Sequence, residues 1–463
     1  LDGNYPTGTG NVALGDTALD SLQSGGNNNV AIGHNAGTAL TTGYNNVAIG
    51  SGAFDSATDQ QDNVAIGYNA LTAITASGGT LCTAVGSKAL EANTAGYHNT
   101  AVGYGAQDAN THGIRNVSMG RDSLGADTKG SYNTAIGDVA LATQNFTSAT
   151  NSYNTAVGAS AGTAVTTGDQ NTFVGGLCGD ANTTGRNNAA FGYFSLSSNT
   201  TANENAAFGV NSLYLNTTGT ANTAVGTYSL QNNTTASNNT SVGYQALYDN
   251  TTGAQNTSVG FRSLYNNTTA SNNTAVGQDA LYTNTTGANN VALGHSTLVY
   301  LTTSSNNVAV GHQAGYSKTT GNSITALGRQ ALYSNTTGGD NTAVGLNALY
   351  ANTTASNNTA VGTSALDANT TGANNTAVGL NALTNQTTAG TNTAIGARAG
   401  QDVTTGSNNT LMGYQAGQNI TTGYENTFIG VNAGDAITDS YNNTFVGRNA
   451  GSAITSGVGN TII

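Results

Sequence analysis

The sequence contains few of the residues on which most enzymes, membrane proteins and nucleic-acid-binding proteins depend. Its 463 residues include no Trp, one Pro and two Cys, and Asp, Glu, Lys and Arg make up only 7%, against about 25% in ordinary globular proteins. No stretch approaches the ~18 consecutive apolar residues of a membrane-spanning helix. The 10 Lys and Arg are scattered among 22 Asp and Glu, so we expect no membrane span and no basic patch for nucleic acid.

What the sequence has in abundance is a repeat rich in Gly, Asn, Thr and Ala. A motif such as Asn-Thr-Ala-Val-Gly recurs 26 times, and 22 of the 25 intervals between its closing glycines are seventeen residues. We call each repeat a rung and number its positions from that Gly, which is position 0. The longer intervals, 15–33, 67–86 and 137–158, are predicted to contain loop insertions, because their additions are polar. A short period sustained along the chain is typical of a solenoid.

Seventeen residues suit one coil of a parallel β-solenoid, or β-roll, with two short strands and two turns, because Asn-Thr-Thr-Gly is poor material for a helix. We therefore predict an all-β fold of about 26 rungs. The prediction is a single continuous solenoid domain over residues 1–463, with a partial first rung at 1–10 and a partial last rung at 460–463. At roughly 4.8 Å per rung, it would be a rod on the order of 125 Å long.

Side chains alternate along a strand, and this assigns positions within each rung. Position −4 is Asn in 24 of 26 rungs, which predicts a ladder of amide hydrogen bonds between stacked copies. Position −1 is apolar in all rungs, and position +4 is Leu in sixteen. In the rung of Gly362, for example, we expect Asn358 to be a ladder residue and Val361 and Leu366 to lie in the core.

Positions +4 and +7 compensate each other in size. In six of the eight rungs with Gly at +4, position +7 is aliphatic, whereas +7 is polar in thirteen of the sixteen Leu rungs. A close-packed interior demands constant apolar volume, so both positions are predicted to reach one core. Two rungs break the rule, Gly179 with Asn182 and Gly315 with Lys318, and are expected to be locally weak. The core is thin, which favours association between chains.

The repeat resembles that of a known family. NNVAIGHNAG at 28–37 and NNVAIGSGA at 45–53 are similar to the YadA-like head repeats of trimeric autotransporter adhesins, and related NTAVG repeats occur in tail-fibre-like proteins. The resemblance covers essentially the whole chain. It implies a left-handed parallel β-roll, three chains side by side, and exposure outside a cell or on a virion, but no ligand. The adhesin repeat is a few residues shorter, and the Asn-Thr-Thr-Gly turn is additional here.

No catalytic motif accompanies the repeat. We find no HExxH, Walker A, GxSxG or CxxC motif and no paired carboxylates, so we expect no enzyme and no cofactor or metal. Cys82 and Cys178 lie five rungs apart, too far for a mutual disulfide, and are predicted to be buried free thiols. His295 and His312, at position +1 of consecutive rungs, are expected to be exposed and stacked.

Tyrosines form a candidate surface row. They directly follow the Leu at +4, so they should project away from the core. Aromatic rows can stack on sugar rings or mark contacts between chains, and the thin core favours the contact. The row consists of Tyr214, Tyr248, Tyr265, Tyr282, Tyr333 and Tyr350.

The Asn-Thr-Thr segments form a second row, for which three interpretations remain open. They can be turns, because Asn and Gly tolerate left-handed conformations and Thr hydroxyls satisfy nearby backbone groups. They are also N-x-Thr sequons and therefore candidates for N-glycosylation. Parallel rows of Thr can, thirdly, order water as an ice-binding face. The Asn residues are Asn216, Asn250, Asn267, Asn284, Asn335, Asn352 and Asn369.

Together these patterns predict a structural extracellular fibre or stalk of adhesin or appendage type, at a cell or virion surface. We expect it to associate with itself, as a homotrimer or a head-to-tail filament. The alternatives are a phage tail-fibre shaft, or a glycan- or ice-binding solenoid that uses its Tyr or Thr rows. Surface glycans or a host receptor are the further candidate partners.

Overall fold

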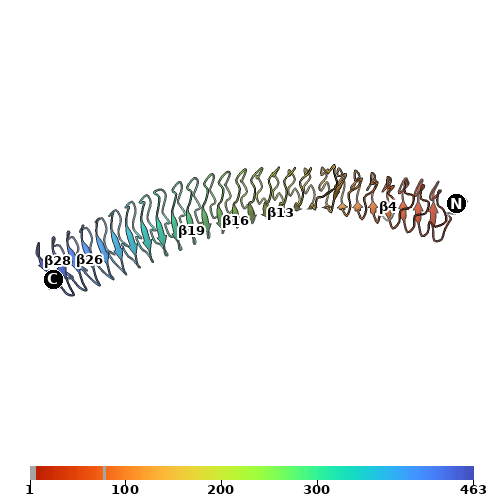
Figure 1. Ribbon diagram of the computed structural model, residues 1–463. Helices are drawn as coiled ribbons and strands as arrows, with labels where there is room; N and C mark the ends of the chain where they lie inside the picture. Colours follow the sequence, from red (N-terminus) through yellow and green to blue (C-terminus); the bar gives the residue numbers. More distant parts are fainter. Residues whose placement is uncertain (1–6, 77–79) are drawn as a thin grey trace. The chain divides into compact units, whose positions relative to one another are not determined.

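In the computed structural model, which describes residues 7–76 and 80–463, every regular element is a β-strand. The strands recur about once per 17 residues and pair in parallel, so the predicted all-β parallel solenoid is confirmed. The chain divides into two compact units, Leu1–Ala236 and Ser237–Ile463, each of which is a stack of coils (Figure 1). The single continuous domain stays a prediction.

The first unit pairs each strand with the strand of the next rung, in register. Val30 lies opposite Val47, and Thr155 lies opposite Thr172. The strands of this sheet are β1 (Val12–Leu14), β2 (Val30–Ile32), β3 (Val47–Ile49), β4 (Val64–Ile66), β5 (Thr83–Val85), β6 (Thr100–Val102), β7 (Val117–Met119), β9 (Thr134–Ile136), β11 (Thr155–Val157), β12 (Thr172–Val174), β13 (Ala189–Phe191), β14 (Ala206–Phe208) and β15 (Thr223–Val225).

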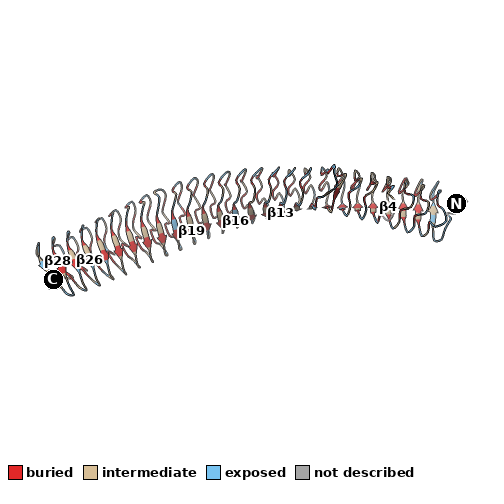
Figure 2. Ribbon diagram, viewed as in Figure 1, coloured by how far each residue is buried: buried red, intermediate tan, exposed pale blue. Residues whose placement is uncertain are grey.

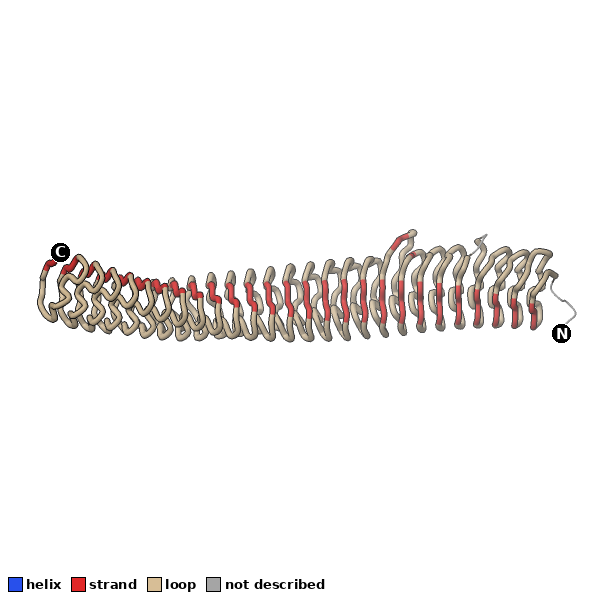
Figure 3. The backbone as a smooth tube through the Cα atoms, turned by 90° about the horizontal axis from the view of Figure 1, so that it is seen from below, coloured by secondary structure: helices blue, strands red, loops and turns tan. Residues whose placement is uncertain are grey.

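The second unit repeats this pattern without insertions. Thr342, Thr359 and Thr376 lie opposite one another in successive strands, and the strands follow one another along the stack (Figure 3). They are β16 (Thr240–Val242), β17 (Thr257–Val259), β18 (Thr274–Val276), β19 (Val291–Leu293), β20 (Val308–Val310), β21 (Thr325–Leu327), β22 (Thr342–Val344), β23 (Thr359–Val361), β24 (Thr376–Val378), β25 (Thr393–Ile395), β26 (Thr410–Met412), β27 (Thr427–Ile429), β28 (Thr444–Val446) and β29 (Thr461–Ile462).

The three longer rungs keep the strand register, as a loop insertion requires. Val12 pairs with Val30, Val64 with Thr83, and Thr134 with Thr155. In the longest rung, part of the insertion forms β10 (Thr150–Asn151), which pairs in parallel with β8 (Gly130–Ser131) of the preceding rung. The prediction of loop insertions is therefore confirmed for 15–33 and, apart from the strand at Thr150–Asn151, for 137–158. For 67–86 it falls partly on residues 77–79, which lie outside the described residues.

The expected second strand of each rung is wrong, because that segment is a series of turns. In the rung of Gly362 (φ 135°), Ser364 at +2 has φ 53° and Leu366 at +4 has φ 54°, values that a β-strand does not allow. The segment still bonds to its neighbour, since the Leu366 N–H donates to the Ala382 carbonyl at 3.0 Å. A left-handed backbone conformation costs steric energy for a residue with a Cβ but not for Gly. This is a second explanation for the occurrence of Gly in place of Leu at position +4.

The inward side of the strand is position −2 rather than position −1. Ala360 is fully buried, whereas Val361 is only half-buried, so the expectation that Val361 lies in the core is wrong. Leu366 is fully buried, as predicted. Figure 2 shows the buried residues along the strands. The interior is narrow. With Ala at −2 it has room for one Leu, which comes from position +4 on the other side of the coil, and the larger side chain at −1 points outward.

The compensation between +4 and +7 is confirmed, and a third position takes part in it. Where +4 is Gly, aliphatic residues such as Leu40, Val403 and Ile437 at +7 are buried. Large residues at −2 occur only in rungs with Gly at +4, and there they fill the space of the missing Leu. A Cβ on Gly179 would lie 2.5 Å from the Phe173 ring, so the ring fills the space that a Leu at +4 would take. The local weakness expected of this rung stays a prediction. The large residues are Phe173, Leu411, Phe428 and Phe445.

Candidate functional site

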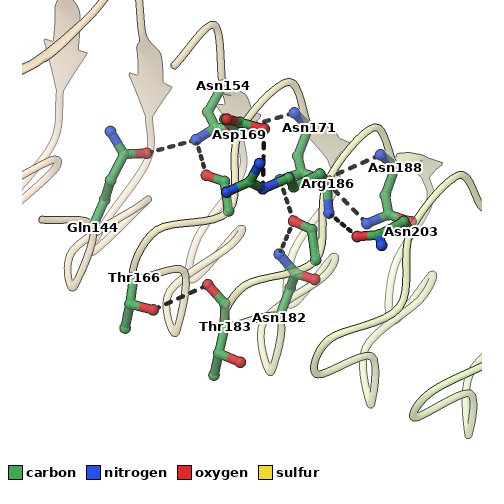
Figure 4. Close-up of polar contacts among 12 residues, drawn as sticks. Gln144, Asn154, Thr166, Asp169, Asn171, Asn182, Thr183, Arg186, Asn188 and Asn203 are labelled. Atoms are coloured by element: carbon green, nitrogen blue, oxygen red, sulfur yellow. Dashed lines mark hydrogen bonds and ion pairs between the residues drawn. The ribbon is translucent and has the colours of Figure 1, made fainter. Parts of the chain in front are cut away.

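Position −4 forms the predicted asparagine ladder along the interior. The backbone N–H and the Nδ2 of Asn188 both donate to Asn171 Oδ1 at 3.1 Å, and Nδ2 also donates to the Ala202 carbonyl at 2.9 Å. Figure 4 shows this column with Asn154, Asn171 and Asn188. Each amide thus joins a neighbouring rung and satisfies a turn inside its own coil. A buried column of this kind favours in-register stacking over any slipped arrangement.

Position +7 forms a second asparagine ladder that sequence reasoning missed. Asn216 Nδ2 donates to Asn199 Oδ1 at 3.0 Å and to the Gly219 carbonyl at 2.9 Å, and both asparagines are fully buried. The signal was present in the sequence, because +7 alternates between aliphatic residues and Asn, and both belong to the interior. The Asn-Thr-Thr segment is therefore a turn whose first residue points inward.

The Thr that follows this Asn also serves the turn. Thr353 Oγ1 donates to the Thr370 carbonyl of the next rung at 3.1 Å, and the same bond recurs from rung to rung. The second Thr, at position +9, is exposed, as in Thr354 and Thr371. The turn interpretation of this row is confirmed in these contacts.

The seven predicted glycosylation sites do not fit the folded chain, because all seven side chains are fully buried. In six of them, Nδ2, the atom that would carry a sugar, donates to a backbone carbonyl three residues ahead. A glycan has no room there. The accessible asparagines of Asn-Asn-Thr sequons lie instead at position −5, as Asn357 and Asn374 do. The buried seven are Asn216, Asn250, Asn267, Asn284, Asn335, Asn352 and Asn369.

The tyrosines at position +5 stack face to face along the second unit. Tyr248, Tyr265 and Tyr282 have ring centroids 5.1 and 5.3 Å apart. A sugar ring stacks on an aromatic face, and here the inner faces are covered by neighbouring rings, so this column presents mainly edges. In the first unit, Tyr214 stands edge-on to Phe194 at 5.6 Å.

A second tyrosine column contains a residue that sequence reasoning missed. Tyr316, Tyr333 and Tyr350 have ring centroids 5.0 and 5.1 Å apart. Tyr316 follows Gly315, so a search for Tyr after Leu overlooked it; counting from position 0 would have found it. Its hydrogen bond with Tyr300, together with burial, raises the pKa of Tyr316 to about 12.

The cysteines and histidines lie as predicted. Cys82 and Cys178 are buried free thiols, and burial raises their pKa values to about 11 and about 12. A thiol with so high a pKa is a poor nucleophile at neutral pH. The exposed rings of His295 and His312 stack with centroids 5.3 Å apart.

Lys318 is a fully buried cation at position +7. Its Nζ donates to Asn335 Oδ1 at 2.8 Å and to the Gly338 carbonyl, while Asn335 Nδ2 has no partner. Burial lowers the pKa of Lys318 to about 8, and the charge of Asp340 opposes this only weakly. The side chain thus occupies the place of an aliphatic residue and continues the +7 ladder with its ammonium. That this rung is locally less stable than its neighbours stays a prediction.

Asp127 is a buried carboxylate at the same position of another rung. It accepts hydrogen bonds from the Gly130 and Phe146 N–H groups at 3.0 and 3.1 Å, and from Gln144 Nε2 at 2.7 Å. Burial nevertheless raises the pKa of Asp127, because these bonds only partly replace water. Neither this group nor Lys318 has an ionic partner within ion-pair distance in the described ranges. The salt bridges there join other residues, such as Arg186 and Asp169 at 3.6 Å (Figure 4).

The outward side of the strands forms a regular, uncharged surface. Positions −3 and −1 point out of the coil and are partly exposed, and no rung has a charged residue at either position. In β21–β28 the pattern is unbroken, with Thr at every −3 and an aliphatic residue or Met at every −1. We call this set the outer strand face. Its residues are Thr325, Thr342, Thr359, Thr376, Thr393, Thr410, Thr427 and Thr444 at −3, and Leu327, Val344, Val361, Val378, Ile395, Met412, Ile429 and Val446 at −1.

The comparisons with known proteins found no similar protein of established function. Neither a protein-family model nor a curated protein matches the chain. Within residues 7–76 and 80–463, no group of three or more His, Cys, Asp or Glu is placed to hold a metal ion. The same residues contain no helix that could cross a membrane.

Proposed function

We propose that this chain is a structural part of an extracellular fibre or stalk, of adhesin or appendage type, carried on a cell or virion surface. The observation that supports this most is the continuous bonding from rung to rung within each unit. It combines backbone hydrogen bonds with two buried asparagine ladders. The interior is occupied by these ladders and a thin core, so the buried side chains stabilise the stacking of one rung on the next.

The bonding suits a load-bearing role, because several sides of each coil are tied to the next. In the second unit, the N–H groups of Thr359, Leu366 and Thr370 donate to carbonyls of the following rung at 2.8, 3.0 and 2.8 Å. These residues lie on the strand, on the inner turn and on the Asn-Thr-Thr turn. A pull along the stack would therefore be shared by many short hydrogen bonds at every rung.

The tyrosine columns support the further proposal that copies associate side by side. The rings at +5 are partly exposed and ordered by stacking, and exposed aromatic rows commonly mark contacts between proteins. Their covered faces make sugar stacking the weaker interpretation. A partner chain can instead pack against the ring edges and the hydroxyl groups.

Two measurements test this proposal. Immunogold labelling of intact cells or virions of the source should place the chain on their surface; an internal location would contradict it. Sedimentation should give a multiple of the mass of one chain. Replacing Tyr316, Tyr333 and Tyr350 by Ser should lower that mass, whereas a matched set at exposed +1 positions, Tyr68 and Tyr104, should not.

A further inference from the structure

The outer strand face of β21–β28 has features that neither a structural role nor the tyrosine columns explain. Its eight threonines and eight apolar residues are all partly exposed, yet no charge interrupts them. An exposed strand surface of a soluble protein normally carries Lys or Glu, which keep strands from associating. A surface that is open, regular and free of charge over eight successive rungs suggests a specific ligand.

The hydroxyl groups of this face are free to meet water. In the described part of the chain, no hydrogen bond engages the hydroxyl of Thr359, Thr376 or any other of the eight threonines, whereas the turn hydroxyls such as Thr353 Oγ1 are bonded internally. The backbone fixes their directions, because successive strands pair in register and a β-branched side chain has few rotamers on a strand. The hydroxyls and methyls thus stand in fixed rows.

The rows form a two-dimensional lattice. Neighbouring rungs repeat at about 4.8 Å along the stack, in agreement with the stacked rings of Tyr316 and Tyr333 at 5.0 Å and of Tyr424 and Tyr441 at 4.7 Å. Along one strand, the −3 and −1 side chains lie about 6.7 Å apart. Eight rungs give an array on the order of 30 Å long.

A lattice of this kind can hold an ordered layer of water. Methyl groups restrict the orientation of the water molecules around them, and hydroxyls fix such water by hydrogen bonds. The two repeat distances are close to oxygen spacings on the prism plane of ice. We propose that the outer strand face of β21–β28 binds ice through a layer of water ordered by its Thr and aliphatic rows.

The same features disfavour the other simple occupant, a second copy of this chain packed on the face. Two sheets packed face to face would bury the eight threonine hydroxyls of each copy. A buried hydroxyl without a hydrogen-bond partner destabilises an interface, and the aliphatic row opposite offers no partner. Water, by contrast, satisfies every hydroxyl.

The strands of this unit also turn gradually about the stack (Figure 3), so a flat crystal plane meets only part of the array at once.

This geometry leads us to expect inhibition of ice recrystallisation more than a large depression of the freezing point. The test uses the full chain in an annealed frozen film, with grain growth as the readout. Wild type should slow grain growth several-fold relative to buffer. The central substitutions Thr359→Arg, Thr376→Arg and Thr393→Arg should abolish the effect.

A matched control lies in the same three rungs. Thr371→Arg, Thr388→Arg and Thr405→Arg add the same charge at exposed turn positions and should leave the effect unchanged. The fold-preserving set Thr359→Val, Thr376→Val and Thr393→Val keeps the shape of the face and should weaken the effect partly, with an unchanged circular dichroism spectrum.

Three outcomes would overturn the proposal. The first is wild-type chain that does not slow grain growth. The second is activity lost equally in the turn set, which would move the site to the Asn-Thr-Thr row. The third is a strand set that changes only the sedimentation of an oligomer, which would make the face an interface between copies. Ice affinity and surface location are measured separately, so this proposal and the structural one can fail independently.

Discussion

Replacing Lys318 by Met isolates the energetic cost of a buried cation in the solenoid interior. Lys318 is fully buried, and burial lowers its pKa from 10.5 to about 8. A difference of roughly 2.5 pKa units, at ~1.4 kcal/mol per unit, corresponds to about 3.5 kcal/mol. This is the amount by which the folded state disfavours the charged ammonium relative to the unfolded chain.

The sign of the pH dependence follows from the direction of this pKa. Because the folded-state pKa is the lower one, the folded chain gives up its proton first as the pH rises. The penalty is complete below about pH 8, shrinks between pH 8 and 10.5, and is absent above. The free energy of unfolding of wild type, relative to Lys318→Met, should therefore rise by about 3 kcal/mol between pH 7 and 10.5.

The variant suits this comparison, because Met keeps an unbranched apolar stem in the core and does not titrate. All other titratable groups are common to both proteins, so their contributions cancel in the difference between the two stability curves. Guanidinium unfolding followed by circular dichroism at several pH values gives the two curves.

A direct titration checks the same reasoning. The chain has three lysines, Lys88, Lys129 and Lys318, so a sample labelled with ¹³C at lysine Cε gives three signals, one of which the variant lacks. That signal should titrate near pH 8. A midpoint near 10.5, with parallel stability curves for wild type and variant, would refute the conclusion that the ammonium is enclosed.

Three further predictions concern other buried groups. Burial raises the pKa of Asp127, so its charge destabilises the fold: wild type should lose stability relative to Asp127→Asn as the pH rises through that pKa, and flat difference curves would contradict this. Phe173→Ala should lower the free energy of unfolding by about 3–5 kcal/mol, and Gly179→Leu should lower it by overpacking the same rung. The double variant has Ala at −2, Leu at +4 and Asn at +7, the combination common in other rungs, so it should be more stable than the sum of the two losses predicts. Chemical denaturation measures this coupling, and additive losses would argue against a shared space. Cys82 and Cys178, both buried with raised pKa values, should resist thiol reagents at pH 8 in the native chain and react in denaturant, and rapid native labelling would show the interior to be open.

The sequence by itself determined the period, the parallel stacking and the rung composition. A repeat of seventeen residues with Asn at −4 stacks like on like only in parallel register, so ladder residues such as Asn358 could be assigned without coordinates. The exchange of aliphatic residues between +4 and +7 likewise revealed a common core, because volume must be conserved wherever side chains are closely packed.

The tertiary structure alone decided which side of each strand faces inward. Alternation groups −1 with −3 and −2 with −4, but it does not say which group lies inside. Hydrophobicity favoured Val361, and the narrow interior instead accepted Ala360, because the opposite wall already supplies Leu366. The structure likewise shows that Asn369, a candidate glycosylation site from the sequence, is a buried ladder residue. The threonines at position −3 of β21–β28 lie on the outer side of the strands and are partly exposed.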